Sequence, residues 1–313
     1  MKIAVLGHSN SWYLRDLQRA AQQKQPLKIE LNAVSFTQIS ARVEPDRNAS
    51  PAFLSNTHNL TTYDAVLVRT MPPGSLEQVI FRMNALTMLQ YASDSTRQFI
   101  PPLILNSPRA IEMAVDKYLS LALLRQNNIS VPRTHICQQA DAAMHAYEQL
   151  GPDVVVKPLF GGEGRGITRV SDPALALRAF KMIEQLDGVI YQQEFIPHKG
   201  FDIRILVIGD NAFAMRRVNP DDWRTNLSLG ARAEPFEASS ELIQLAHQAA
   251  KVVQAKIAGV DILITPDGTP TVLEINAVPG WKGLAEATGK DIALEVLTFT
   301  MEQIANHRKK IIT

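Results

Sequence analysis

The connections between the expected strands change character partway along the chain, and this change limits the fold more than any other feature. Before residue 106, apolar runs predict strands at 3–6, 31–36, 65–68 and 103–105. Residues 11–24 are polar and compatible with a helix, and 75–92 has helical spacing. Strands that alternate with helices are typical of an open α/β sheet. After residue 150, the expected strands pair as hairpins, 203–208 with 212–218 and 260–264 with 271–275. The sequence therefore predicts an amino-terminal α/β half followed by a mostly antiparallel α+β half.

Ser107 and Pro108 mark the first domain boundary, because serine caps helices well and proline fits the first helical turn. The helix that they begin is expected to run through Lys117 to about Gln126. We expect three domains, at 1–106, 107–191 and 192–313.

Two other segments have a clear local pattern. Residues 42–62 contain Pro45, Pro51 and many Asn, Ser and Thr residues, which predicts a loop. Ser240 is expected to cap a long amphipathic helix that ends near Ile257.

The charge and cysteine content exclude several classes of protein. Thirty-two basic and 31 acidic residues give a net charge of +1, whereas nucleic-acid-binding proteins usually carry a basic excess. The single cysteine, Cys137, cannot form an internal disulfide, which suits a reducing cytoplasm. No apolar run approaches the ~20 residues of a membrane span, and the apolar start at 1–7 fits a first strand better than a secretory signal. We therefore expect a cytoplasmic protein that binds neither nucleic acid nor membrane.

A cluster of glycines stands between two expected strands, 154–157 and 167–170. Its members are Gly161, Gly162, Gly164 and Gly166. Glycine lets backbone N–H groups approach an anion closely, and Lys157 at the end of the first strand could meet phosphate. The loop lacks the Gly-Lys-Ser/Thr of a Walker A motif and does not open a helix, as the dinucleotide fingerprint would. Both a phosphate-binding loop and a flexible glycine hairpin fit this pattern.

Oxygen-bearing side chains gather on the second hairpin. Glu274 and Asn276 alternate onto one face of their strand, and antiparallel pairing can bring Asp261 opposite them. Buried carboxylates need a cation, and oxygen ligands without His or Cys favour Mg²⁺ over Zn²⁺. The competing interpretation is a turn or cap role for Asp261 and a solvent-facing position for Glu274. The pattern favours a metal site.

Arginines are frequent between these two candidate sites. Arg204 and Arg216 lie on the two strands of the first hairpin, and Arg224 shares a short segment with Asn226. Arginine forks bind phosphate or carboxylate through two parallel hydrogen bonds. For any single arginine, a solvent-exposed ion pair is the competing interpretation. The segment that holds Arg224 and Asn226 is interpreted as functional.

Taken in order, these features resemble the ATP-grasp ligases, and specifically the RimK-like glutamate ligases. The residues that carry the resemblance are Lys117, Lys157, Gly161 to Gly166, Gln193-Glu194-Phe195-Ile196, Asp202-Ile203-Arg204, Arg224-Thr225-Asn226, Gly259-Val260-Asp261-Ile262-Leu263 and Glu274-Ile275-Asn276-Ala277-Val278-Pro279-Gly280. The resemblance covers residues 105–290. It implies a pre-ATP-grasp α/β domain at 1–106, followed by a two-lobed ATP-grasp fold with lobes at 107–191 and 192–313.

The resemblance also implies a role for each of these residues. The implied ATP-binding residues are Lys117, Lys157, Gly161, Gly162, Gly164, Gly166, Gln193, Glu194, Phe195, Ile196, Asp202, Arg224 and Asn226. The implied catalytic residues are Arg204, Arg224 and Asn226. The implied ligands of two Mg²⁺, for which Mn²⁺ could substitute, are Asp261, Glu274 and Asn276. In this arrangement the glycine loop closes over the phosphates, 194–196 contacts adenine, and Asp202 meets the ribose.

The reaction that the resemblance implies is an ATP-dependent ligation. A substrate carboxylate attacks the γ-phosphoryl group to give an acyl phosphate and ADP, and an amine then displaces phosphate and leaves an amide. The favoured outcome is the addition of L-glutamate to the carboxyl terminus of a peptide, a protein or a glutamylated cofactor. The alternatives are a LysX-like ligase for another amino acid or amine, and a nucleotide-binding regulator without catalysis. A homo-oligomer is compatible with each.

Several positions depart from the usual RimK pattern. Gly162 and Glu163 stand where Ser or Thr and Gln are usual, and 227–231 replaces a stretch that usually contains His-Arg-Gly-Gly. Val278 replaces a small serine before Pro279. These positions lie where an acceptor could approach, so the resemblance says less about the acceptor than about the ATP chemistry.

Overall fold

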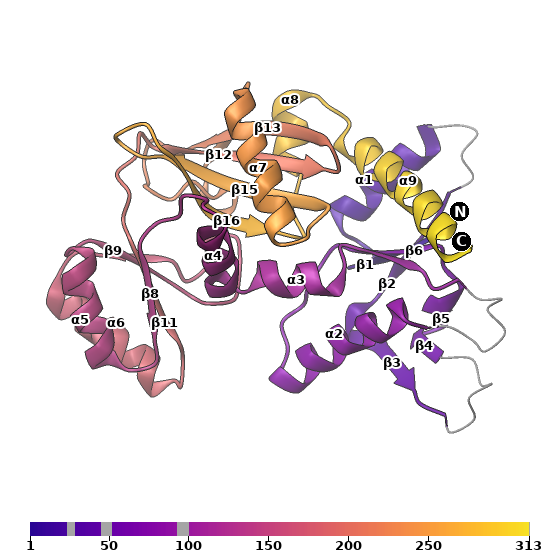
Figure 1. Cartoon of the computed structure of the whole chain (residues 1–313), viewed down its shortest axis with the longest axis horizontal. Helices are drawn as coiled ribbons and strands as arrows, with labels where there is room; N and C mark the ends of the chain where they lie inside the picture. Colours follow the sequence, from indigo (N-terminus) through magenta and orange to yellow (C-terminus); the bar gives the residue numbers. More distant parts are fainter. Residues whose placement is uncertain (24–28, 45–51, 93–99, 313) are drawn as a thin grey trace.

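The first part of the fold is a parallel sheet. The computed structural model describes residues 1–23, 29–44, 52–92 and 100–312 (Figure 1). The parallel strands, in the order β2-β1-β6-β7, are β1 (Lys2–Leu6), β2 (Glu30–Val34), β6 (Ala65–Val68) and β7 (Leu103–Leu105). Alternate residues of β1 face opposite layers, since Ala4 packs with α2 (Leu76–Gln90) and Ile3 packs with α1 (Trp12–Gln23) and α9 (Ile292–Ile312). These strands confirm the predicted α/β half.

A small antiparallel sheet occupies part of the segment that was predicted to be a loop. Its strands are β3 (Ile39–Arg42), β4 (Ala52–Ser55) and β5 (His58–Asn59). The loop prediction for 42–62 is wrong because Phe53 and Leu60 bury their side chains in the core, and the polar composition conceals this alternation. Residues 45–51 lie outside the described part of the chain.

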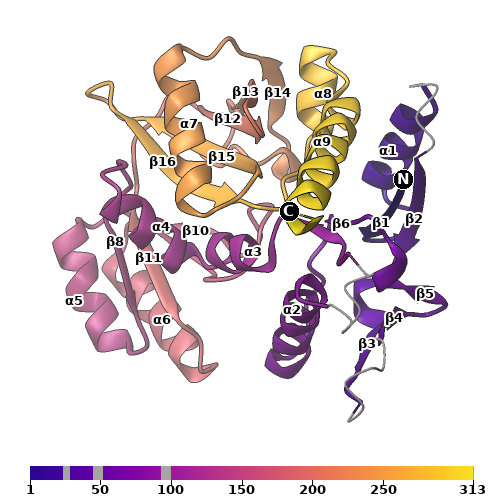
Figure 2. The ribbon, with the colours of Figure 1, turned by 45° about the vertical axis from the view of Figure 1, so that its right-hand side comes forward.

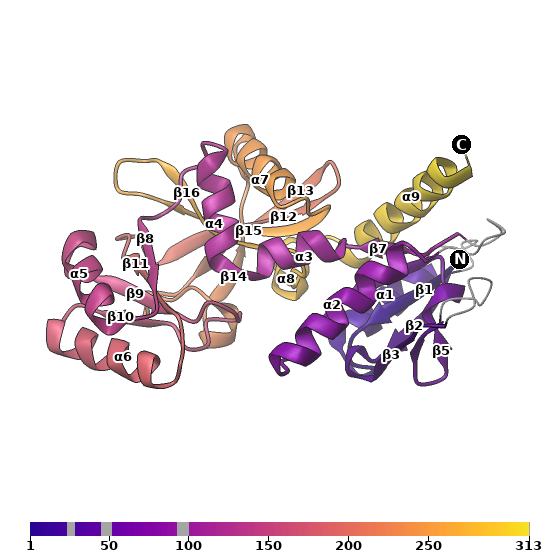
Figure 3. The ribbon, with the colours of Figure 1, turned by 60° about the horizontal axis from the view of Figure 1, so that its bottom comes forward.

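The central part of the chain forms a second, antiparallel sheet. In the order β10-β9-β11-β8, its strands are β8 (Thr134–Cys137), β9 (Val154–Lys157), β10 (Thr168–Val170) and β11 (Ile190–Glu194). Helices α5 (Ala140–Leu150) and α6 (Pro173–Gln185) cover it, at the far end of the molecule from β1 (Figure 3). The sequence pattern indicated β9, β10, β11 and α6, but not β8 or α5.

The largest sheet has five antiparallel strands. In the order β14-β13-β12-β15-β16, they are β12 (Phe201–Ile208), β13 (Asn211–Val218), β14 (Arg232–Pro235), β15 (Ile257–Ile264) and β16 (Pro270–Asn276). Both predicted hairpins are present, as β12–β13 and β15–β16. Helices α7 (Ser240–Val252) and α8 (Lys282–Thr288) pack around the sheet (Figure 2). The division into three domains stays a prediction, although these sheets follow its order along the chain.

Two predicted helices have different ends in the structure. The helix expected from Ser107 to Gln126 is two helices, α3 (Pro108–Val115) and α4 (Lys117–Gln126), which break at Asp116. Asp116 causes the break because its backbone is extended and its side chain caps the second helix. Ser239, rather than Ser240, caps α7, which ends at Val252 and leaves 257 to begin β15.

The cap of α4 gives a first prediction. Oδ1 of Asp116 accepts hydrogen bonds from the backbone nitrogens of Tyr118 (2.9 Å) and Leu119 (3.0 Å). Asp116→Ala is expected to lower the free energy of unfolding by about 1 kcal/mol, measured by urea denaturation. Asp116→Asn is the matched control, because asparagine caps equally well and is expected to cost much less. Equal stability of the alanine variant and the wild type would contradict the assignment.

Asn106 joins the parallel sheet to the largest sheet. Its buried side-chain amide donates to the carbonyl oxygens of Ile257 and Ala277, both at 2.6 Å. Its oxygen accepts from the backbone nitrogens of Lys256 (2.8 Å) and Ile257 (3.0 Å). These four bonds tie the end of β7 to the start of β15 and to the turn after β16.

Among the described helices, none combines the length and apolar character needed to cross a membrane.

Candidate active site

A cleft opens between the central sheet and the largest sheet. The predicted site residues that line it are Lys157, Gln193, Glu194, Phe195, Ile196, Asp202, Arg224, Asn226, Asp261 and Glu274. Residues separated by more than a hundred positions in sequence therefore share one cleft. The predicted residues outside its lining are Lys117, Gly161, Gly162, Gly164, Gly166, Arg204 and Asn276.

Lys157 ends β9, and its ammonium group lies in the cleft with little negative charge near it to balance its own. Its Nζ donates to Oε1 of Gln193 at 2.6 Å, and no carboxylate pairs with it among the described residues. Burial lowers the pKa of Lys157 to about 8, and attraction to Glu274 offsets the effect only in part. An anionic ligand in the cleft would supply the missing negative charge.

This lowered pKa predicts a pH dependence of nucleotide binding. A bound anion favours the protonated amine, so binding above the pKa of about 8 must take up a proton. We expect ATP affinity to be level just below this pH and to fall by up to about tenfold per pH unit above it. Calorimetric titration at a series of pH values measures this, with Lys157→Met as the control that lacks the break. A wild-type profile without the break would contradict the prediction.

The glycine loop between β9 and β10 is held from both sides. Nζ of Lys117 donates to the carbonyl oxygen of Gly161 at 2.8 Å, so Lys117 supports the loop. On the other side, Oγ of Ser228 donates to the carbonyl oxygen of Glu163 at 2.6 Å. Gly164 has a φ of +73°, and a Cβ there would lie 2.6 Å from Oδ1 of Asn226. The loop therefore packs against the segment that holds Asn226 and Ser228.

The two carboxylates of the predicted metal site are neighbours, as their register required. Asp261 on β15 pairs with Glu274 on β16, and Asn276 pairs with Gly259 two residues away. Asp261 is only 5% exposed, and Arg204 binds it through Nε–Oδ1 (2.6 Å) and Nη2–Oδ2 (2.7 Å). Arg204 does not line the cleft itself, but it holds in place Asp261, which does.

Arg217 is a site residue that the sequence interpretation missed. It is 3% exposed and lies between two predicted site residues, donating to both oxygens of Asp202 and to Oδ2 of Asp261 (2.9 Å). Burial opposes ionisation of Asp261, but the charges of Arg204 and Arg217 outweigh it and hold the pKa of that carboxyl below its ordinary value. The register of the β12–β13 hairpin, which pairs Asp202 with Arg217, was the available signal. Asp202 would have to share an oxygen with Arg217 to bind a ribose.

The predicted adenine-binding end of the cleft has an aromatic wall. The Phe195 ring packs edge to face with Trp223 at 5.8 Å, and the Arg169 guanidinium lies 3.5 Å from the Phe195 ring centroid. The carboxylate of Glu194 accepts from the backbone nitrogen (2.8 Å) and Nε (2.6 Å) of Arg133. Trp223, which also lines the cleft, was not among the predicted site residues.

Arg224 reaches the cleft as part of an ion pair. Its guanidinium binds Asp222, with Nη2 at 2.5 Å from Oδ2, and its carbonyl oxygen accepts from Nδ2 of Asn219 at 2.8 Å. The surface ion pair considered as the alternative is therefore present, and the residue also lines the cleft. The two interpretations are compatible.

The oxygen donors fit a divalent cation that arrives with a nucleotide. Glu274 has no hydrogen-bond or ion-pair partner among the residues the structure describes, and it is only half-buried. In the described part of the chain, no three His, Cys, Asp or Glu side chains cluster to hold a metal ion. Two carboxylates and one amide suit Mg²⁺, which usually completes its shell with water and substrate phosphates.

Comparisons with known proteins agree with this geometry. A family model described as the RimK-like ATP-grasp domain matches residues 114–300. The tetrahydromethanopterin:alpha-L-glutamate ligase of Methanosarcina acetivorans is 30% identical over 320 aligned positions, covering 92% of this chain and 94% of that protein. A probable alpha-L-glutamate ligase of Teredinibacter turnerae is 34% identical over 240 positions, covering 75% and 79%.

A solved structure shows the same fold. The ATP-grasp ligase PsnB, complexed with minimal precursor, Mg and ADP, has a TM-score of 0.70 at 22% identity, covering 97% of this chain and 98% of that one. This likeness confirms the two-lobed ATP-grasp fold with an amino-terminal α/β lobe. Because the family model also spans more than half of the 313 residues, the chain belongs to the RimK-like ATP-grasp family.

Proposed function

We propose that this RimK-like ATP-grasp ligase joins the amino group of L-glutamate to a terminal carboxyl group of a peptide, a protein or a glutamylated cofactor. The observation that carries the proposal is one cleft that holds an ammonium group, Lys157, and a carboxylate, Glu274, neither of which has an ion-pair partner among the described residues. The names of the two relatives, both alpha-L-glutamate ligases, support glutamate as the amino acid.

Different residues of the cleft bind different parts of ATP in this proposal. Lys157 compensates phosphate charge, and Lys117 keeps the glycine loop in place over the phosphates. The backbone of 194–196 and the aromatic wall at Phe195 hold the base. Asp261, Glu274 and Asn276 are the proposed ligands of two Mg²⁺ ions, with Mn²⁺ as a substitute. When bound, the metal would offset the negative charge of the phosphate oxygens.

The reaction then needs positioning more than a side-chain nucleophile. The acceptor carboxylate attacks the γ-phosphorus, and the bond to the bridging oxygen breaks. ADP is the leaving group, and the acceptor becomes an acyl phosphate. The amine attacks the acyl carbon, phosphate leaves, and the amine loses a proton. Arg224 and Asn226, which both line the cleft, are the residues proposed to hold the transferred group, and Asn226 also lies beside Gly164 of the loop. The closed loop would keep water from the acyl phosphate.

The test is incubation with ATP, Mg²⁺, L-glutamate and candidate acceptors, followed by mass spectrometry for added glutamyl units. Release of ADP and phosphate is measured in parallel. Addition of a different amino acid, from a panel that includes lysine, would favour the LysX-like alternative. ATP binding without turnover for any acceptor would favour the non-catalytic regulator.

A further inference from the structure

The strand order of the parallel sheet reverses at one point, and the space outside the carboxyl ends of β1 and β6 at that point, called the crevice below, is separate from the residues that line the nucleotide site. The chain leaves β1 toward β2 on one side, while β6 lies on the other side, so the strand order reverses between β1 and β6. In open α/β sheets, ligands bind outside the carboxyl ends of the strands at such a point. Arg69 directly follows β6, and its Cβ would lie 3.8 Å from a Cβ built on Gly7, which follows β1. Arg69 therefore stands at this crevice.

The guanidinium of Arg69 lies in an aromatic box. Its central carbon is 4.2 Å from the ring centroid of Trp281 and 5.0 Å from that of Tyr13. Its Nη2 donates to the carbonyl oxygen of Pro279 at 2.6 Å. Pro279 and Trp281 belong to the turn that begins directly after Asn276. The crevice thus adjoins the metal-binding end of the cleft.

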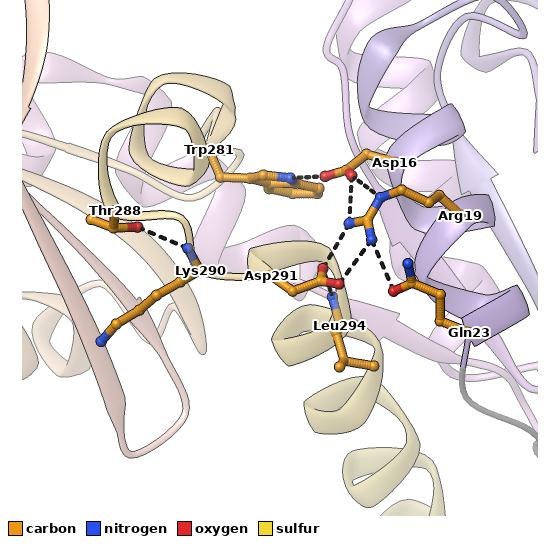
Figure 4. Close-up of polar contacts among 8 residues, drawn as sticks. All are labelled: Asp16, Arg19, Gln23, Trp281, Thr288, Lys290, Asp291 and Leu294. Carbon is orange, nitrogen blue, oxygen red and sulfur yellow. Dashed lines mark hydrogen bonds and ion pairs between the residues drawn. The ribbon is translucent and has the colours of Figure 1, made fainter.

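A chain of polar contacts fixes one wall of the box (Figure 4). Trp281 is fully buried, and its Nε1 donates to Oδ2 of Asp16 on α1 at 2.9 Å. Asp16 also binds Arg19 at 2.8 Å, and Arg19 binds Asp291, next to α9, at 2.7 Å. The position of Trp281 is therefore set before any ligand arrives.

Arg69 is a half-buried cation that has no ion-pair partner among the described residues. Its Nε is buried without a hydrogen-bond partner, and no carboxylate pairs with it among the described residues. Arg204, Arg217 and Arg224, by contrast, all bind carboxylates. Burial lowers the pKa of Arg69 to about 10, so the guanidinium remains charged at neutral pH. Arginine forks are suited to carboxylates, which bind them with two parallel hydrogen bonds.

We propose that Arg69 binds a non-reacting carboxylate of a substrate in the crevice between β1 and β6. This inference rests on the proposed ligase function, which places two carboxylate-bearing substrates beside the γ-phosphate. Tyr13 contacts both Arg69 and the turn after Asn276, since a Cβ built on Gly280 would lie 2.4 Å from the Tyr13 hydroxyl. The carboxylate belongs either to the incoming L-glutamate or to the acceptor.

The experiment compares Arg69→Met with wild type in an ADP-release assay. L-Glutamate and the dipeptide L-glutamyl-L-glutamate serve as amino acid and acceptor, and each KM is measured with the other substrate saturating. We expect one KM to rise about 10- to 100-fold, because a charge-assisted bidentate contact is lost. A rise for L-glutamate assigns the carboxylate to the amino acid, and a rise for the dipeptide assigns it to the acceptor. Two KM values within about twofold of wild type would overturn the proposal.

Two controls keep the result specific. Arg109→Met removes an exposed arginine whose ion-pair partner among the described residues is Glu112 on α3, and both KM values should stay unchanged. The Kd for ATP should also be unaffected by Arg69→Met, which separates the crevice from the nucleotide site. If Arg69→Met does not fold, Arg69→Lys decides, since it keeps the charge and loses the planar fork. A shifted KM in that variant supports the proposal and unchanged values overturn it.

Failure of the proposed ligase function gives a different result from failure of the Arg69 proposal. If wild type forms no amide with any pair of substrates, the ligase proposal fails. Calorimetric titration of L-glutamate and of the dipeptide, with Mg²⁺ and a non-hydrolysable ATP analogue present, then tests Arg69 alone. Weaker binding of one compound by Arg69→Met than by wild type supports the crevice as a carboxylate site. Equal binding by both proteins overturns it.

Discussion

Replacing Glu274 with glutamine is expected to reduce Mg²⁺-dependent turnover by about 10²- to 10³-fold while leaving the fold intact. Glu274 has no partner among the described residues, so its replacement breaks no contact that holds β16 in place. The amide keeps the size of the side chain but removes the charge that a divalent cation requires. Activity should fall without a matching loss of thermal stability.

Initial rates over a range of Mg²⁺ concentrations measure this effect. Glu286→Gln is the matched control, because Glu286 lies on α8 and its one ion pair among the described residues is a surface contact with Lys282 at 3.9 Å. The control should keep wild-type rates. A kcat of Glu274→Gln close to that of wild type at saturating Mg²⁺ would remove Glu274 from the metal site.

Replacing Lys157 with methionine should change binding and stability in opposite directions. Loss of the ammonium group is expected to weaken ATP binding by about 10- to 100-fold, since charge-assisted hydrogen bonds to phosphate are lost. The same change should raise the free energy of unfolding by about 1–3 kcal/mol at pH 7, because folding lowers the pKa of this amine from 10.5 to about 8. Protonated Lys157 therefore lowers the free energy of unfolding, and methionine removes this destabilisation.

The pH dependence of stability distinguishes this cause from a better-packed methionine. In wild type the cost is complete below pH 8 and disappears as the pH rises through 10.5, the ordinary pKa. The stability difference between the two proteins should therefore shrink over this interval in urea denaturation. Lys181→Met, at an exposed position on α6, is the matched control and should show neither effect. A pH-independent difference, or unchanged ATP affinity, would contradict the assignment.

Much of the site could be predicted because strand alternation is a local property. The alternation of Glu274 with Asn276, and their pairing with the strand of Asp261, follow from a two-residue period and one short turn. The position of Lys157 at a strand end is equally local. The sequence therefore indicated which residues share a cleft before their partners were known.

What could not be predicted depends on partners that are distant in sequence or on a single residue's backbone. Arg217 joins Asp202 to Asp261, and although the register of β12 and β13 pairs it with Asp202, that hairpin does not reveal the second contact with Asp261. Lys117 holds a loop 44 positions away. Asp116 divides one amphipathic pattern into two helices without interrupting its apolar spacing. Arg69 was missed because its aromatic neighbours come from both ends of the chain.

The packing of α9 against α1 has a consequence for biosynthesis. The face of the parallel sheet that carries Ile3 and Val5 is completed by α1 together with Val296 and Leu297 of α9. Because β1 is synthesised long before α9, this face of the sheet stays uncovered until α9 has left the ribosome. Nascent chains that stop short of α9 would present this apolar surface to chaperones and proteases, whatever the state of the catalytic lobes.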